Sequence, residues 1–218
     1  PVLIVCPSSV TYNWLHELMQ FAPELQAIVI DGEQAVRKEL LRDLANVDVL
    51  ITSYPLLRRD LALYEKLMFH TVFFDEAQAF KNPTTQTARA VKKIKADYRF
   101  GLTGTPVENN EQELWAIFHV IFPQLFQGLQ EYSHLTRKAI ARRVRPFLLR
   151  RLKENVLTEL PSKNEAIEMS ELLPEQKELY AALLAKLRVD TLKHLDKDTF
   201  RKNRIRILAG LTRLRQIC

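Results

Sequence analysis

The sequence predicts an α/β fold in three layers, with helices on both faces of a parallel sheet, and a mainly helical C-terminal extension. Short, nearly all-apolar runs recur along the first hundred residues, as expected of strands that are buried on both faces. Segments with helical periodicity separate these runs, which favours right-handed crossovers between parallel strands. After Pro123 the apolar runs cease and basic amphipathic segments follow.

Five segments are predicted as strands because they are short, apolar and rich in β-branched or aromatic residues. In chain order they are Val2–Cys6, Ala27–Ile30, Val49–Thr52, Thr71–Phe74 and Tyr98–Leu102. Helices are predicted between them by apolar residues at helical spacing and by residue types that begin helices. These helices are Val10–Phe21 with Ser8 and Ser9 as candidate N-caps, Gln34–Leu44, Asp60–Leu67, and Thr84–Ile94 after Pro83.

The C-terminal third is predicted to be helical. Apolar side chains recur at helical spacing in two segments, Tyr180–Leu187 and Ile207–Cys218. Between Pro161 and Pro174, the alternation in Asn164–Met169 predicts a short strand. We therefore divide the chain into an α/β part, residues 1–125, and a helical part, residues 126–218.

Composition narrows the class of protein. At 218 residues and 47% hydrophobic, the chain can bury a sizeable core. Two cysteines, Cys6 and Cys218, do not make a disulfide framework, so we expect an intracellular location: cytoplasm or nucleoid in a bacterium, nucleus in a eukaryote. No apolar stretch is long enough to span a membrane, and none of the five histidines has a partner at metal-ligand spacing.

Positive charge is concentrated at the C-terminal end. Residues 1–130 carry 12 Lys/Arg against 15 Asp/Glu, whereas residues 131–218 carry 20 against 11. Eight basic residues and no acidic one lie between Arg137 and Lys153. Such a run is expected either to contact phosphates or simply to form a solvated helix face.

Two strand ends carry residues suited to phosphoryl transfer. Asp75 and Glu76 directly follow the fourth predicted strand, at the sheet edge where open α/β folds bind ligands. In phosphoryl-transfer motors, one such carboxylate holds Mg²⁺, usually through water, and a neighbouring acid orients the attacking water. Thr103, Gly104 and Thr105 follow the next strand, where hydroxyls can bond to the acidic loop and glycine permits close backbone approach. The alternatives are a loop that only caps a helix and a plain turn.

In its motifs and their order, the chain resembles the Swi/Snf-type DNA-translocating ATPases of helicase superfamily two. The resemblance covers nearly the whole chain. The matching segments are Cys6-Pro-Ser-Ser9 with Trp14, Ile51-Thr-Ser-Tyr54, Asp75-Glu-Ala-Gln78 with Lys81-Asn-Pro83, Leu102-Thr-Gly-Thr-Pro106 with Glu108-Asn109, Glu113-Leu-Trp115, Arg145-Pro-Phe-Leu-Leu-Arg-Arg151 with Lys153, Leu160-Pro161 with Lys163, and Leu214-Arg-Gln-Ile-Cys218.

The resemblance implies a RecA-like lobe and an ATP site. Asp75 would hold Mg²⁺ through water, Glu76 would polarise the hydrolytic water, and Gln78 would sense the γ-phosphate. The segment Thr103–Thr105 would couple the nucleotide state to movement of a second RecA-like lobe. Residues 126–218 would form the helical protrusion and the linker to that lobe, although the stretch from Pro123 to Arg145 is short for the family.

The resemblance also implies double-stranded DNA as a partner. Ser8, Ser9, Thr52 and Ser53 would grip phosphates of the tracked strand, with helix capping as the alternative for the two N-terminal serines. Arg142 and Arg143 belong to the basic run, and Arg150 and Arg151 would brace DNA or the second lobe, with packing between lobes as the alternative. Trp14 and Trp115 are expected to be core anchors, because each lies on a helical apolar stripe.

One motor element is missing from this sequence. None of its five glycines is followed by the Lys-Ser/Thr of a phosphate-binding loop, so we expect the chain on its own to be inactive. Two functions from different classes remain: part of an ATP-dependent DNA translocase that remodels DNA-bound protein complexes, or a non-catalytic module that binds nucleic acid or a partner protein. A related RNA or restriction-type helicase is a weaker third.

Overall fold

A computed structural model of the chain describes residues 1–104, 111–151, 156, 159, 164–192 and 197–218. Within these residues the chain divides into two compact units, Pro1–Arg150 and Arg151–Cys218. Thr105 and Lys153, which the sequence analysis singled out, lie outside the described residues.

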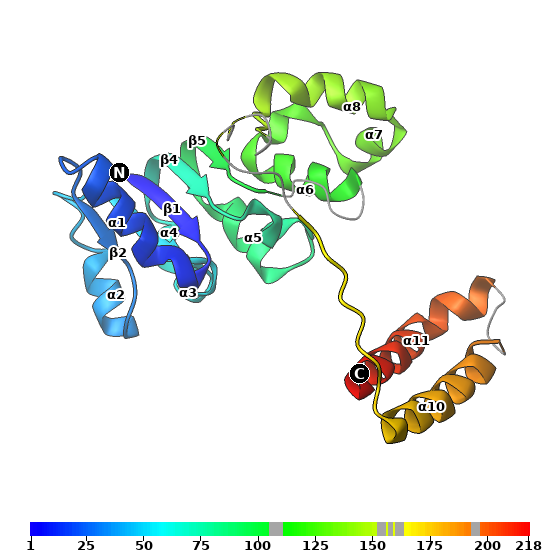
Figure 1. Ribbon diagram of the computed structural model, residues 1–218. Coiled ribbons are helices and arrows are strands. Elements are labelled where there is room, and N and C mark those ends of the chain that lie inside the picture. Colours follow the sequence, from blue (N-terminus) through cyan, green and yellow to red (C-terminus); the bar gives the residue numbers. More distant parts are fainter. Residues whose placement is uncertain (105–110, 152–155, 157–158, 160–163, 193–196) are drawn as a thin grey trace. The chain divides into compact units, whose positions relative to one another are not determined.

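The first unit is built on a five-stranded sheet in which every pairing is parallel, in the order β2-β3-β1-β4-β5 (Figure 1). All five predicted strands are present: β1 Val2–Cys6, β2 Ala27–Val29, β3 Val49–Ser53, β4 Met68–Phe74 and β5 Lys95–Gly101. β4 and β5 each begin three residues earlier than predicted, because their backbones already pair at Met68 and Lys95. Backbone pairing there extends beyond the apolar run that the sequence analysis could detect.

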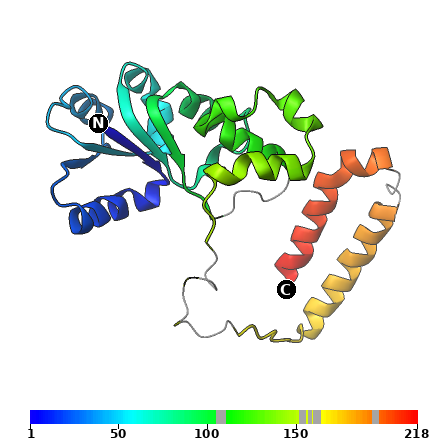
Figure 2. The same ribbon diagram turned by 90° about the horizontal axis from the view of Figure 1, so that it is seen from above.

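Helices cover the two faces of the sheet, as the α/β prediction requires. Alternate residues of β1 point to opposite faces: Leu3 and Val5 belong to one buried cluster and Ile4 and Cys6 to another. The helix α1, Thr11–Phe21, packs on the second cluster, and Figure 2 shows it on one side of the sheet. The first cluster receives residues from α2 Gln34–Leu40, α3 Tyr54–Arg59, α4 Leu61–Tyr64, η2 Ala77–Phe80, α5 Gln86–Lys93 and α6 Glu111–Ile121.

Two predicted helices differ from the structure. The helix expected at Gln34–Leu44 ends at Leu40. The helix expected at Asp60–Leu67 is present as the shorter α4, Leu61–Tyr64, and a helix that was not expected, α3, Tyr54–Arg59, ends just before Asp60. The carboxylate of Asp60 is buried and accepts two hydrogen bonds from the buried guanidinium of Arg37, at 2.5 and 3.1 Å. Asp60 is therefore committed to an ion pair with α2 and does not begin a longer helix.

The α/β unit continues beyond residue 125. On one side α6 places Ile117 and Val120 in the first cluster, and on the other it places Trp115 and Phe118 in a third cluster. That cluster is completed by residues of η3 Pro123–Leu125, α7 Leu129–His134 and α8 Arg137–Val144, with η4 Arg145–Phe147 following. The first compact unit includes these helices and ends at Arg150.

The second unit contains two long helices, α10 Pro174–Leu192 and α11 Lys197–Ile217, which lie side by side in both views (Figures 1 and 2). Gly210 of α11 lies against Leu187 of α10, where a Cβ would collide with the leucine side chain. The strand predicted at Asn164–Met169 is wrong, because these residues form neither strand nor helix. Ile167 and Met169 are about nine-tenths exposed, so the alternation there does not reflect a buried face.

Candidate functional site

Four strand ends meet at one edge of the sheet. The parallel register pairs Cys6 of β1 with Ser53 of β3, and Phe74 of β4 with both Val5 and Gly101. The segments that follow β1, β3, β4 and β5 therefore emerge together at the carboxyl edge, where open α/β sheets bind ligands. These segments carry most of the residues that the sequence analysis selected.

The acidic loop has an unusual backbone at Glu76. Its φ and ψ are 51° and 54°, and it is the one non-glycine residue with positive φ in the part of the chain that the structure describes. Residues with a side chain disfavour this left-handed conformation, and such strain is concentrated at functional sites. The Glu76 side chain is exposed, whereas Asp75 is half-buried and Ala77 is fully buried. The turn presents the second carboxylate to solvent at the sheet edge.

Asp75 is fixed by hydrogen bonds to four residues from different parts of the chain. Its Oδ1 accepts the backbone N–H of Glu76 at 2.9 Å, and its Oδ2 accepts the indole N–H of Trp14 at 3.0 Å. Its backbone carbonyl accepts the hydroxyl of Tyr54 at 2.6 Å, and its N–H donates to the carbonyl of Val5 at 2.8 Å. Each carboxylate oxygen thus has one donor and retains capacity for another.

Burial keeps two neighbours of Asp75 protonated. It raises the pKa of the Cys6 thiol to about 12, and the charge of Asp75 adds to the effect. The pKa of Tyr54 is also raised, first by burial and then by the charge of Asp75. Tyr54 therefore remains a hydrogen-bond donor to the acidic loop across the physiological pH range.

Gln78 connects the acidic loop to the end of β5. Its amide nitrogen donates to Glu76 Oε2, and its amide oxygen accepts the hydroxyl of Thr103 at 2.7 Å. Backbone bonds join the same segments, from Leu102 to Phe74 at 2.8 Å and from Ala77 to Leu102 at 2.9 Å. The expected contact between the threonine segment and the acidic loop is present at Thr103.

The close backbone approach expected at Gly104 occurs instead at Gly101. A Cβ on Gly104 would have no neighbour within 4 Å among the described residues. A Cβ on Gly101 would collide with Ile121 and would lie 3.3 Å from Ala77. At Gly101, therefore, β5 passes close to both α6 and the acidic loop, and a larger residue would require the Ile121 side chain to move.

The four predicted hydroxyl residues at the sheet edge divide into two pairs. Ser8 and Ser9 are exposed in η1, Ser8–Val10, and neither caps α1, whose N-cap Val10 makes no side-chain bond. Their assignment as N-caps is wrong. The opposite holds at β3, because Thr52 is fully buried and the hydroxyl of Ser53 caps α3 by accepting the N–H of Leu56. The side chains of Thr52 and Ser53 are therefore not presented to an external strand.

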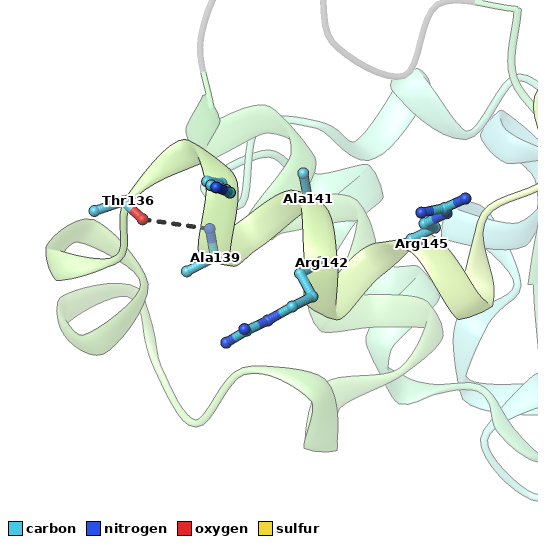
Figure 3. A pocket seen from close by; sticks show the side chains of 6 residues that line it. Thr136, Ala139, Ala141, Arg142 and Arg145 are labelled. Atoms are coloured by element: carbon cyan, nitrogen blue, oxygen red, sulfur yellow. Dashed lines mark hydrogen bonds between the residues drawn. The ribbon is translucent and has the colours of Figure 1, made fainter.

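The basic residues between Arg137 and Arg151 differ in their contacts. The residues Lys138, Arg142 and Arg145 line an open hollow on and just after α8, together with Thr136, Ala139 and Ala141 (Figure 3). Arg142 and Arg145 extend in different directions, so the two cations are spread along the segment. Arg143 forms an ion pair with Glu131 at 3.3 Å, and Ile140 and Val144 face the core. Arg150 and Arg151 are exposed.

Sequence analysis missed the polar role of Trp14. Its ring does pack on the sheet with Ile4, Cys6 and Ile51, as a core anchor should, but its N–H reaches Asp75. The signal was available in principle, since a packed tryptophan usually finds a partner for its N–H. Trp115 fits the simpler interpretation, because it is buried in the third cluster and its ring stacks on that of His119, with the centroids 4.6 Å apart.

The side chains of the site suit a magnesium ion that is held in part by the protein and in part by a bound phosphate compound. Among the described residues no three His, Cys, Asp or Glu side chains gather to hold a metal ion by themselves. Mg²⁺ is commonly bound by one or two carboxylates together with waters and substrate phosphates. Asp75 fits such a site, because each of its carboxylate oxygens has one hydrogen-bond donor and can accept another.

No described helix has the length and apolar character needed to cross a membrane.

Comparison with known proteins identifies a single family over the whole chain. The SNF2-related domain family matches residues 1–218. The TATA-binding protein-associated factor MOT1 of Saccharomyces cerevisiae is 34% identical over 241 residues, covering 100% of this chain and 13% of that protein. The putative ATP-dependent helicase/translocase YwqA of Bacillus subtilis is 35% identical over 233 residues, covering 100% of this chain and 25% of that protein.

A solved structure agrees with the sequence relatives. The Sulfolobus solfataricus SWI2/SNF2 ATPase core in complex with dsDNA superposes with a TM-score of 0.64 and 33% identity, covering 100% of this chain and 47% of that chain. This chain thus spans about half of the solved core and a smaller share of the curated relatives. The parallel sheet with its flanking helices is the RecA-like α/β fold, followed by a helical C-terminal part.

Proposed function

The chain belongs to the SNF2-related domain family, and from this premise we propose that it supplies the acidic half of the ATP site in an ATP-driven double-stranded DNA translocase. The observation that carries the proposal is the hydrogen-bonded connection between the ends of β4 and β5. Asp75 and Glu76 follow β4, and Gln78 connects them to Thr103 after β5. Phosphoryl transfer depends mainly on positioned charge, and this network positions two carboxylates.

Each residue of the acidic loop has a distinct role in this proposal. Asp75 holds Mg²⁺ through water, using the oxygen lone pairs that Trp14 and the Glu76 N–H leave free. Bound Mg²⁺ supplies neutralisation of phosphate charge. Glu76, exposed on its left-handed turn, orients the attacking water. Gln78 lies between Glu76 and Thr103, so that a change at the γ-phosphate reaches the end of β5.

DNA contact is proposed at two places on the described surface. Ser8 and Ser9 offer exposed hydroxyls at the sheet edge, and Arg142, Arg150 and Arg151 offer exposed cations. We assign Arg143 a smaller share, because Glu131 already pairs with it. The burial of Thr52 and Ser53 removes their side chains from the proposed contact. A DNA-bound relative of the same fold supports duplex DNA as the partner.

The complete function requires more than this chain. A phosphate-binding loop of the GxxxxGK[S/T] form does not occur in its sequence, so we propose that these 218 residues alone do not turn over ATP. The intact protein would add that loop and a second RecA-like lobe, and would act inside the cell on DNA-bound protein complexes.

The test is ATP turnover by the intact protein with duplex DNA, single strands and RNA in parallel. The proposal expects stimulation by duplex DNA above the other two. Stimulation by RNA alone would favour the related RNA helicases. Tight nucleic-acid binding without any turnover would favour a non-catalytic module that acts through the basic C-terminal third.

A further inference from the structure

The ring of Trp14 packs on an apolar cluster, whereas its indole N–H points to a carboxylate. The ring is half-buried and packs against the cluster of Ile4, Cys6 and Ile51 on the sheet face. The N–H leaves this apolar cluster and meets Asp75 Oδ2 at 3.0 Å. A tryptophan side chain has few rotatable bonds, so packing of the ring fixes the direction of its N–H.

The carboxylate of Asp75 is oriented by two donors. Oδ1 receives the Glu76 N–H and Oδ2 receives the Trp14 N–H, so rotation of the carboxylate would break at least one bond. The Glu76 bond is local to the turn, whereas the Trp14 bond comes from α1, 61 residues earlier in the chain. A hydrogen bond to an ionised acceptor is about twice as strong as a neutral one. Trp14 is thus the long-range support of this acid.

We infer that Trp14 is a positioning residue for Asp75: its indole N–H sets the carboxylate angle at which Asp75 holds Mg²⁺. The inference rests on the proposed function, because it assigns the metal to Asp75. It goes beyond packing, because packing requires the ring of Trp14 and not its N–H. Replacement by phenylalanine keeps an aromatic ring but removes the N–H donor together with part of the indole, so a control for the lost ring area is needed.

The chain offers a matched control in its only other tryptophan. Trp115 is also packed in an apolar cluster, and its indole N–H has no hydrogen-bond partner within the described residues. Trp115→Phe therefore changes the same chemical group without touching the acidic loop. Comparison of the two variants separates loss of the Asp75 bond from loss of an indole ring.

The first measurement is a ¹⁵N–¹H spectrum of the indole groups in the 218-residue chain, with the two signals assigned by Trp115→Phe. We expect Asp75→Asn to move the Trp14 proton signal upfield and to leave the Trp115 signal in place, because an amide is a weaker acceptor than a carboxylate. An unmoved Trp14 signal would overturn the inference without bearing on ATP hydrolysis.

The second measurement is the Mg²⁺ dependence of DNA-stimulated ATP turnover in the intact protein. Trp14→Phe should raise the Mg²⁺ concentration for half-maximal turnover about tenfold, as loss of one hydrogen bond to a charged group permits. Trp115→Phe should leave that concentration unchanged, and saturating Mg²⁺ should restore most of the Trp14→Phe rate. Equal Mg²⁺ curves for the two variants would overturn the positioning role. A wild-type protein without turnover would refute the proposed function, and with it the role of Trp14, even where the spectrum shows the hydrogen bond.

Discussion

The hydroxyl of Thr103 donates to the amide oxygen of Gln78 at 2.7 Å, which joins the end of β5 to the loop after β4. The amide nitrogen of the same glutamine holds Glu76. A displacement of either strand end therefore changes the environment of the exposed carboxylate. The proposed coupling between nucleotide state and lobe movement depends on this short chain of side chains.

Removal of the Thr103 hydroxyl tests that chain. Thr103→Val preserves the shape of the side chain and deletes the donor to Gln78, a bond worth about 1 kcal/mol. We expect DNA-stimulated turnover of the intact protein to fall about fivefold while nucleotide affinity is maintained. Thr212→Val, which deletes a threonine hydroxyl bonded within α11, serves as the control. A fall of the same size in both variants would show that Gln78 is not the reason.

The buried pair of Arg37 and Asp60 is predicted to be a main determinant of stability. Both side chains are about 1% exposed, so Arg37→Met leaves an uncompensated buried carboxylate, at a cost of about 3 to 5 kcal/mol. Lys93→Met breaks the surface pair with Glu65, where the lysine is 57% exposed, and should cost less than about 1 kcal/mol. Urea unfolding of the 218-residue chain measures both. Similar losses for the two variants would contradict the prediction.

The chain's sequence was a reliable guide to the strands and a partial guide to the site. Val2–Cys6 and Val49–Thr52 were placed to within one residue, because central parallel strands are continuous apolar runs. The positions of Asp75, Glu76 and Thr103 followed from the strand ends. What sequence periodicity does not contain is which distant side chains meet. The Trp14 bond to Asp75, the burial of Thr52 and the commitment of Asp60 to Arg37 all depend on how helices dock on the sheet.

Cys6 is predicted to be inert at ordinary pH. Burial raises its pKa to about 12, so the native thiol stays protonated, whereas an unfolded cysteine ionises near pH 9. The unfolded state therefore loses this proton first, and the contribution of Cys6 to stability should decline as pH rises from about 9 to 12. Thiol titration at pH 8 should modify the exposed Cys218 in the native chain and both cysteines in urea. Rapid native labelling of two thiols per chain would contradict this assignment.

The basic side chains that line the open hollow at α8 are predicted to contact DNA phosphates. Arg142→Glu in the intact protein should lower the slope of log affinity against log salt by about 0.9 or more, the effect of a lost phosphate contact. The loss should be the same for unrelated duplex sequences, because backbone contacts carry no sequence information. Arg143→Glu should have a smaller effect, since Glu131 already neutralises Arg143. Lys38→Glu on the exposed face of α2 is the control, and an unchanged slope for Arg142→Glu would support a solvated helix face instead.

The central claim is that Glu76 orients the attacking water, and single-turnover ATP hydrolysis by the intact protein with duplex DNA tests it most directly. We predict that Glu76→Gln binds nucleotide with nearly wild-type affinity and hydrolyses it about 100-fold more slowly, as expected for removal of a general base. Glu24→Gln, at an exposed position outside the sheet edge, should hydrolyse at the wild-type rate. Retention of more than half the wild-type rate by Glu76→Gln would contradict the assigned role.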